Sequence, residues 1–353
     1  MSKLKVSFPH MGNYYIPAKY LLSHIVDADI IIPPFITAKT IELGSKYSPD
    51  FVCTPFKYTL GTMIESLEQG ASILIQFGGG CRYGYYSELQ EQILKELGYK
   101  FELLNLVSGK ANIKRIYKMI KRIDKKFNIF KGLYHLYIAK NMVKYMDRVD
   151  DYIRKNVGFE VNKNSFDNLN KEMLDKFSKV NNPISLYILY KKYFHKFKKL
   201  KINKPKNCLK VGVIGELYTL MEPFSNYYLE KELASYNIEI KRFTNVNYLL
   251  FKNKKTIKKA LRKSKKYMKY KMCADASSNI DWTKYLCNKK YDGIIHIKSS
   301  FCTPEIGSMP IIDKIANNYN VPIIYFSFDA NTSEVGIKTR LEAFYDMIEM
   351  RRQ

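Results

Sequence analysis

Three of the six cysteines stand at positions where a thiolate could do chemistry. Cys53 follows a short apolar run and precedes a predicted helix, and Cys302 follows the apolar run "GIIHI" in the same way. Cys81 follows another apolar run and the glycines Gly78–Gly80. A helix N-terminus stabilises a thiolate, and glycines let the backbone approach a bound group closely. Such thiolates could hold an iron–sulfur cluster or act as nucleophiles, although three buried structural cysteines would give the same pattern.

The glycine-rich loop around Cys81 lacks the residues of a phosphate-binding loop. A loop of the type G-x-x-x-x-G-K-S/T needs a lysine and a hydroxyl side chain after its last glycine. Counting from Gly79, Gly84 occupies the last glycine position, but Tyr85 and Tyr86 follow it. The second half of the chain contains only "GVIGE", a fragment of a dinucleotide fingerprint. Nucleotide binding through either segment is therefore disfavoured.

The other cysteines and the histidines do not have the spacing of a zinc site. No two cysteines form a C-x-x-C pair, and the five histidines are scattered and expected to be structural. Cys208 and Cys287 lie in apolar surroundings and are expected to pack in a core. Cys273, in "KMCADASS", could be an extra ligand. Disulfides are not expected in a cytoplasmic chain.

The elements that must position these cysteines alternate between strands and helices. Apolar runs such as 71–77 and 321–329 predict strands, and the segment 55–70 predicts a helix with Thr54 as N-cap and Gly70 at its end. This alternation indicates open, mostly parallel sheets covered by helices. Ligands of such sheets bind beyond the carboxyl ends of the strands, where all three cysteines are predicted.

The sequence divides into three predicted parts. Residues 1–110 form an α/β domain with two of the three cysteines, residues 111–206 a basic helical insert, and residues 207–353 a second α/β domain with the third. The predicted fold class is α/β, with two Rossmann-like open parallel-sheet domains and the helical insert between them.

The chain is strongly basic, with 59 Lys and Arg against 33 Asp and Glu and a net charge of +26. Such a charge can mark nucleic-acid or anionic-membrane binding. The lysines are, however, spread along helices, and Lys, Asn, Ile and Tyr are abundant throughout. A basic nucleic-acid-binding protein that uses the helical insert, with structural cysteines, is therefore the alternative function. No RNP-like or zinc-type module supports it, so nucleic acid is not the expected partner.

Localisation is predicted from two absences in the sequence. The N-terminus "MSKLKVSFPHMGNYY" has no apolar signal region. No apolar run approaches the roughly 20 residues that span a bilayer. We expect a soluble, cytoplasmic protein without membrane association.

Three blocks of the sequence resemble one known family. They are "FVCTPFKYTLGTMIESLEQGASILIQFGGGCRYGYYSELQEQILKELGY", "VGVIGELYTLMEPFSNYYLEKEL" and "SSFCTPEIGSMPIIDKIANNYNVPIIYFSFDANTSEVGIKTRLEAFYDMI". These blocks resemble the 2-hydroxyacyl-CoA dehydratase superfamily, which includes acyl-CoA dehydratase activase-related proteins and double-cubane cluster proteins. The resemblance covers nearly all of both predicted α/β domains and little of the basic insert.

The resemblance implies a cofactor and the residues that hold it. The cofactor would be an oxygen-sensitive iron–sulfur cluster, either 4Fe–4S or a double cubane, with Cys53, Cys81 and Cys302 as metal ligands. Other residues expected at the site are Gly79, Gly80 and Arg82 beside the cofactor, and Glu305 and Glu334 as catalytic candidates. The chain departs from the family at two segments. It reads "SSFC" where relatives commonly carry a phenylalanine–glycine pair, and it reads "KMCADASSNID" where relatives often have a glycine-rich motif.

The resemblance also implies partners and a reaction. The electron donor would be an ATP-hydrolysing iron–sulfur activator of the actin/Hsp70-like class, and the protein would form a homodimer or pair with a related subunit. If it is an enzyme, it is a radical 2-hydroxyacyl-CoA dehydratase-like lyase or an ATP-dependent double-cubane reductase component. Its substrate would be an acyl-CoA or a small molecule, in an anaerobic cytoplasm, and a role as an electron relay is the other possibility.

Overall fold

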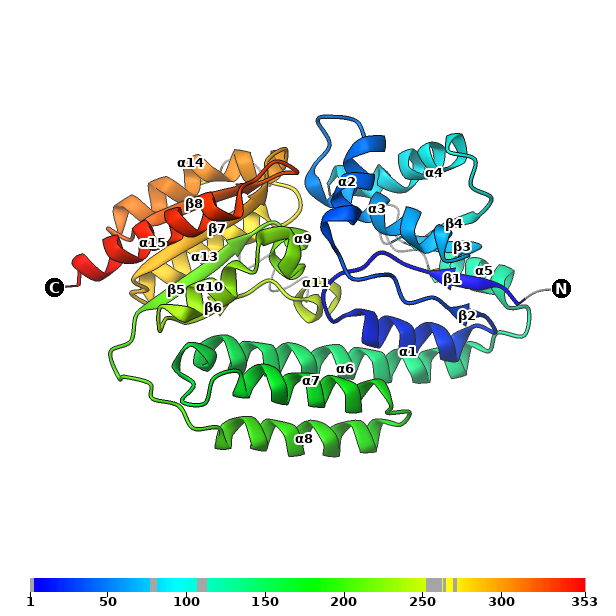
Figure 1. Ribbon diagram of the computed structural model, residues 1–353, viewed down its shortest axis with the longest axis horizontal. Helices are drawn as coiled ribbons and strands as arrows, with labels where there is room; N and C mark the ends of the chain where they lie inside the picture. Colours follow the sequence, from blue (N-terminus) through cyan, green and yellow to red (C-terminus); the bar gives the residue numbers. More distant parts are fainter. Residues whose placement is uncertain are drawn as a thin grey trace. The chain divides into compact units, whose positions relative to one another are not determined.

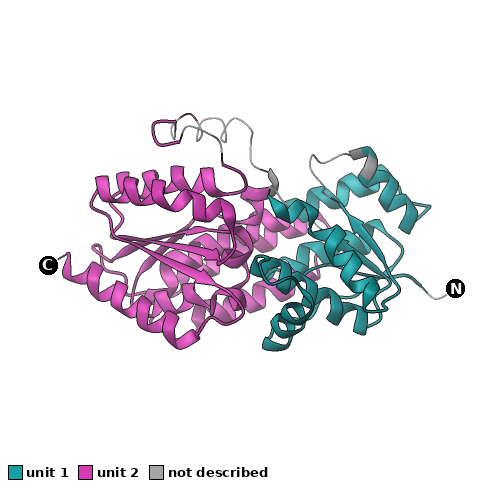
Figure 2. Ribbon diagram, turned by 90° about the horizontal axis from the view of Figure 1, so that it is seen from above, with its two compact units in different colours: residues 1–141 teal, residues 142–353 magenta. Residues whose placement is uncertain are grey.

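The computed structural model describes residues 3–76, 81–106, 113–251, 262, 265–268 and 272–352. The chain divides into two compact units, residues 1–141 and 142–353 (Figure 2). The border between them falls within the long helix α6 (Ile129–Asn156). The three-part division expected from the sequence, at 110/111 and 206/207, stays a prediction.

Unit 1 contains a four-stranded parallel sheet with the strand order β2-β1-β3-β4 (Figure 1). Its elements are, in chain order, β1 (Lys5–Ser7), α1 (Tyr15–Ile25), β2 (Asp29–Ile30), α2 (Ala38–Tyr47), α3 (Thr54–Glu68), β3 (Ile73–Gln76), the 3-10 helix η1 (Arg82–Tyr85), α4 (Tyr86–Glu96), β4 (Glu102–Asn105) and α5 (Ile113–Ile123).

Helices cover both faces of this sheet because the side chains of its central strand alternate between two cores. Ile73 and Ile75 of β3 pack with residues of α1 and α5, while Leu74 packs with residues of α3 and α4. The sheet is therefore the middle of three layers.

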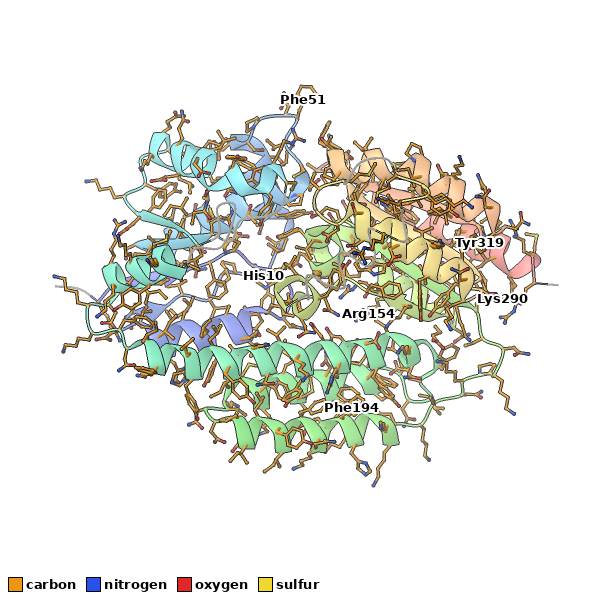
Figure 3. All side chains as sticks on the ribbon, turned by 180° about the vertical axis from the view of Figure 1, so that it is seen from behind. His10, Phe51, Arg154, Phe194, Lys290 and Tyr319 are labelled. Atoms are coloured by element: carbon orange, nitrogen blue, oxygen red, sulfur yellow. The ribbon has the colours of Figure 1, made fainter. Side chains whose placement is uncertain are left out.

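Three long helices come next along the chain: α6, α7 (Ser165–Ser178) and α8 (Pro183–Lys199). They pack through aromatic side chains. Tyr145 of α6 stacks on Tyr190 of α8 at 4.3 Å, and Phe194 of α8 meets Tyr152 of α6 edge to face at 5.5 Å (Figure 3). Arg154 of α6 reaches Glu230 of α10 (Leu229–Ser235), with Nε 2.9 Å from Oε2 (Figure 3). Aromatic contacts thus hold α6 against α8, and an ion pair joins α6 to α10.

Unit 2 carries a second four-stranded parallel sheet, with the order β6-β5-β7-β8. Its other elements are, in chain order, η2 (Val157–Phe159), β5 (Lys210–Gly215), α9 (Leu217–Met221), η3 (Pro223–Asn226), β6 (Glu239–Arg242), α11 (Val246–Phe251), α13 (Ala276–Asn288), β7 (Gly293–Ser299), α14 (Thr303–Asn318), β8 (Ile323–Phe328) and α15 (Glu334–Met350). Ile214 and Ile294 pack against α13 and α14.

The two sheets share one topology, which confirms the predicted fold class. In each, the second strand lies on one side of the first strand and the third strand lies on the other. The order in which strands are added across the sheet therefore reverses between β1 and β3, and again between β5 and β7 (Figure 1). Ligands of such sheets bind outside the carboxyl ends of strands at these points. Cys81 follows β3 and Cys302 follows β7, so the two cysteines hold corresponding positions in the two units.

Candidate functional site

Cys53 lies at the N-terminus of α3. The prediction that it also follows a strand is wrong, because residues 48–52 form turns and bends. The expectation that Thr54 caps this helix is wrong by one residue, because Thr54 is the first helical residue and Cys53 is the N-cap, with φ −69° and ψ 151°. The carbonyl oxygen of Cys53 accepts a hydrogen bond from the backbone N–H of Phe56 at 2.9 Å. Pro55 fits the first turn because the N–H that it lacks would have no partner within the helix. The half-buried sulfur thus sits beside the positive end of the helix dipole.

Tyr86, at the start of α4, contacts Cys53 and also senses the charge of Cys81. Its hydroxyl group is hydrogen-bonded to the sulfur of Cys53. Burial, together with the charges of Cys53 and Cys81, raises the pKa of Tyr86 far above its ordinary value. The phenol therefore stays protonated and can donate a hydrogen bond to a thiolate. Its ring packs against Phe56 at 4.9 Å and Tyr83 at 5.0 Å, which fixes its direction.

Cys81 is the N-cap of the short helix η1 and is half-buried. Its carbonyl oxygen accepts a hydrogen bond from the N–H of Gly84 at 3.0 Å. Arg82 is exposed, and its charge acts to lower the pKa of Tyr86, against the effect of burial. Gly79 and Gly80, which were expected to lie beside the cofactor, are outside the described residues.

Cys302 lies at a helix start in unit 2, as Cys53 does in unit 1. It is the N-cap of α14 and precedes Thr303 and Pro304, so both helices begin after the sequence Cys-Thr-Pro. Its N–H donates to the carbonyl oxygen of Ser299 at 3.0 Å, and its own carbonyl oxygen accepts from Ile306 at 3.0 Å. The side chain is largely buried, with 9% of the residue exposed. The sequence did predict this position, at a strand end and before a helix.

Glu305, a catalytic candidate from the sequence, is buried in a hydrogen-bonded network. Only 1% of the residue is exposed. Its Oε2 atom accepts hydrogen bonds from Nε2 of His296 and Nδ2 of Asn279, both at 2.8 Å. Asn279 also binds the backbone of Gly215, donating to its oxygen at 3.1 Å and accepting from its nitrogen at 3.3 Å. The network links four elements: the last residue of β5, the first turn of α14, β7 and α13.

Sequence reasoning missed His296 and Asn279 as neighbours of the site. His296 was grouped with the scattered structural histidines, and it does lie in the core, with 0% exposed. One signal was available in the strand "GIIHIKS", because His296 and Lys298 are polar residues spaced by two in a strand that is buried throughout. Residues at this spacing lie on one face of a strand. Asn279 carried no comparable signal.

Two further ionisable groups, the buried Lys298 and the half-buried Glu216, lie near Glu305. Burial lowers the pKa of Lys298, and the neighbouring charges of Cys302 and Glu305 act in the opposite direction. Burial also raises the pKa of Glu216, and the charge of Glu305 adds to the effect. Glu216 is held by the N–H and the hydroxyl group of Thr219 at 2.9 and 2.6 Å. The carboxyl ends of the neighbouring strands β5 and β7 therefore concentrate ionisable groups around Glu305.

Glu334, the second catalytic candidate, lies on the surface. It is the first residue of α15, is exposed, and forms an ion pair with Lys338 at 3.0 Å. Ser333 caps the helix by accepting a hydrogen bond from Gly336. A role of Glu334 in the reaction stays a prediction.

The remaining cysteines differ from these three. Cys208 and Cys287 are buried, and burial raises the pKa of Cys287 to about 11, so it is a thiol at neutral pH. Cys287 packs in the core between α13 and α14. Cys273, considered as an extra ligand, is exposed.

A cavity of about 730 Å³ lies elsewhere in unit 1, between α4, β4 and α5. Asn105 lies at the end of β4, and Lys118 and Arg122 of α5 form a basic wall. None of the three cysteines is among the described residues that line it. Across the described ranges, no group of three or more His, Cys, Asp or Glu side chains could hold a metal ion. In the same part of the chain, no helix is both long and apolar enough to cross a membrane.

Comparison with known proteins bears out the resemblance seen in the sequence. Residues 23–348 match the family model described as 2-hydroxyglutaryl-CoA dehydratase, D-component. This range includes all three cysteines, Glu305 and Glu334. No curated protein matches the chain. Because the family model covers most of the chain, the protein belongs to the 2-hydroxyglutaryl-CoA dehydratase D-component family.

Proposed function

We propose that this protein is an iron–sulfur component of a 2-hydroxyacyl-CoA dehydratase. Family membership supports the reaction class. One observation supports an iron–sulfur cofactor: Cys53, Cys81 and Cys302 are each the N-cap of a helix. The first N–H groups of a helix have no partner within it, and its N-terminus carries partial positive charge. Thiolates at such positions suit a polyanionic iron–sulfur cluster.

The surroundings of the cysteines fit this donor set. The hydroxyl group of Tyr86 can donate a hydrogen bond to the sulfur of Cys53. Hydrogen bonds to sulfur tune the reduction potential of a cluster. The positive charge of Lys298 lies near Cys302 and would offset part of the negative charge of the bound group. Cys287, with its raised pKa and apolar surroundings, is unsuited to the same role.

The bound cluster, 4Fe–4S or double cubane, would supply a low-potential electron received from an ATP-hydrolysing iron–sulfur activator of the actin/Hsp70-like class. The overall reaction on a 2-hydroxyacyl-CoA removes the hydroxyl group of C2 and a proton of C3 as water. The cysteines would hold the cluster, and the helix N-termini would stabilise its charge. The protein would work with a second copy or a related subunit, in an anaerobic cytoplasm.

Anaerobic purification with iron and sulfide assays tests the proposal. The protein should be coloured, contain about four iron atoms per cubane, and give an EPR signal after reduction. Cys53→Ala, Cys81→Ala and Cys302→Ala should each lose most of this iron, while the matched control Cys287→Ala should keep it.

Two results would contradict the proposal. One is a colourless wild-type protein that contains no iron after anaerobic reconstitution. The other is iron retention by all three cysteine variants at the level of Cys287→Ala.

A further inference from the structure

The loop that carries Cys302 is closed at its base by two buried side chains. His296 lies in β7, six residues before Cys302, and Glu305 lies three residues after it, in the first turn of α14. Nε2 of His296 and Oε2 of Glu305 are 2.8 Å apart, and the two residues are 0% and 1% exposed. The hydrogen bond therefore joins the two ends of a short segment with the cysteine inside it.

A second hydrogen bond fixes this closure to the rest of the sheet. Asn279 of α13 donates to the same oxygen of Glu305 and is held at both of its polar atoms by the backbone of Gly215. Gly215 is the last residue of β5, the strand beside β7. The closure thus lies between β5 and β7, where the strand order of this sheet reverses. Such sheets bind ligands at these points.

The outer part of the loop is held as well. The N–H of Ser300 donates to the carbonyl oxygen of Phe328 at 2.9 Å, and its hydroxyl group donates to Asp329 at 3.0 Å. Cys302 donates to Ser299 at 3.0 Å. These bonds fix the residues just before Cys302, and the Glu305 network fixes the turn just after it.

The hydrogen bonds of the network suit a Glu305 side chain that is held in a fixed position better than one that reacts. Because a carboxylate accepts hydrogen bonds, His296 carries its proton on Nε2. Its Nδ1 atom is buried and has no hydrogen-bond partner among the described residues. Burying such an atom costs desolvation free energy, which an apolar side chain at this position would avoid. Two donors occupy one oxygen of Glu305, so the carboxylate is held in one orientation.

We propose that His296, Glu305 and Asn279 form a clamp that holds Cys302 in place as a ligand, so that His296 and Glu305 are positioning residues. This inference rests on the proposed function, because it takes Cys302 to be a ligand. It assigns Glu305 a role through Cys302, in contrast to the direct catalytic role expected from the sequence. Residues that orient metal ligands in this way typically change affinity by about 10- to 100-fold when they are replaced.

The test compares four variants by two measurements. His296→Leu removes the donor to Glu305, and His296→Gln restores a nitrogen donor near the position of Nε2. Thr283→Val is the matched control, since Thr283 is fully buried on the same helix as Asn279 and its hydroxyl group donates to the Asn279 carbonyl oxygen at 2.8 Å. Cys302→Ser reports whether the cysteine is a ligand. The measurements are backbone hydrogen exchange of residues 300–306 in the metal-free protein, and iron retained against a chelator after anaerobic reconstitution, with the EPR spectrum.

The expected pattern is specific to the clamp. His296→Leu should speed exchange in residues 300–306 by about tenfold or more, and should weaken iron binding by about 10- to 100-fold with an altered EPR spectrum. His296→Gln should restore both measurements to near wild-type values, and Thr283→Val should change neither. If His296→Leu does not fold, Glu305→Leu, which removes the acceptor oxygen, takes its place, with the same expected loss.

Other outcomes separate the inference from the proposed function. Equal effects of His296→Leu and Thr283→Val would overturn the clamp, because they would reflect general destabilisation. Loss of iron in Cys302→Ser without any change in His296→Leu would overturn the clamp alone. Full iron retention in Cys302→Ser would overturn the ligand role of Cys302, and the clamp's role toward a ligand with it.

Discussion

The hydroxyl group of Tyr86 is hydrogen-bonded to the sulfur of Cys53, 33 positions earlier in the chain. Cys53 precedes α3 and Tyr86 begins α4, so the bond ties together the N-termini of two helices that cover the same face of the first sheet. Burial, followed by the neighbouring Cys53, raises the pKa of Tyr86, so the phenol stays protonated and is able to donate a hydrogen bond. Cys53 is thereby held in one direction by a residue outside its own helix.

Tyr86→Phe should remove this hydrogen bond without changing the ring packing. We expect the free energy of unfolding of the metal-free protein to fall by about 1 kcal/mol. A sulfur that loses a donor stabilises the reduced cluster less, so the midpoint potential should become more negative. Urea unfolding and a redox titration followed by EPR measure the two effects. Tyr85→Phe is the control, because Tyr85 is 78% exposed, and equal changes in both variants would contradict the role of Tyr86.

Asp151 should contribute to stability in a pH-dependent way. Burial acts to raise the pKa of Asp151, but hydrogen bonds from Lys155 at 2.7 Å and Lys241 at 2.6 Å outweigh it and hold the pKa below the ordinary 3.8. A lowered pKa in the folded state means that the contribution is present above pH 3.8 and is lost as the pH falls through the folded value.

Asp151→Asn should therefore lower the free energy of unfolding by about 1 kcal/mol near pH 7, with no difference from wild type well below pH 3.8. Urea unfolding at several pH values measures the difference. Asp175→Asn, at an exposed pair with Lys179, should show a much smaller change. A constant difference at every pH would show that Asp151 acts through packing and not through its charge.

Gly215→Ala should be strongly destabilising. Gly215 has φ +139°, and an added Cβ would lie 1.8 Å from the carbonyl oxygen of Ile297. We expect a loss of about 2 kcal/mol or more in the free energy of unfolding. Gly98→Ala is the matched control, since Gly98 also has a positive φ, +86°, but nothing lies within 4 Å of its added Cβ. Similar losses for both variants would mean that backbone strain alone, and not contact with Ile297, sets the cost.

Glu334→Gln should leave the urea midpoint and the iron content unchanged, because exposed ion pairs contribute little to stability. Lys338→Met removes the same ion pair and is the control. Lost turnover in Glu334→Gln alone, with iron content and stability intact, would give Glu334 the catalytic role expected from the sequence. Equal turnover of both variants and wild type would leave it a surface residue.

Much of the fold could be predicted because it depends on local patterns. The alternation of apolar runs and helical segments predicted two parallel sheets covered by helices, and both are present. The sequence Cys-Thr-Pro predicted a helix start after Cys53 and after Cys302, because proline is favoured in the first turn of a helix. The N-cap was misplaced by one residue, at Thr54, because a threonine side chain is the more usual capping group.

The sequence by itself determined the alternation of strands and helices, the helix starts beside Cys53 and Cys302, and the family of the protein. Only the tertiary structure decided which side chains meet them. His296, Asn279 and Tyr86 bind partners 9, 26 and 33 positions away in the chain. The periods of helices and strands specify which face of an element is buried, but they do not specify which polar group on a neighbouring element it will meet. That choice depends on how parallel strands are ordered in a sheet, and the order β6-β5-β7-β8 brings Gly215 and His296 to one place.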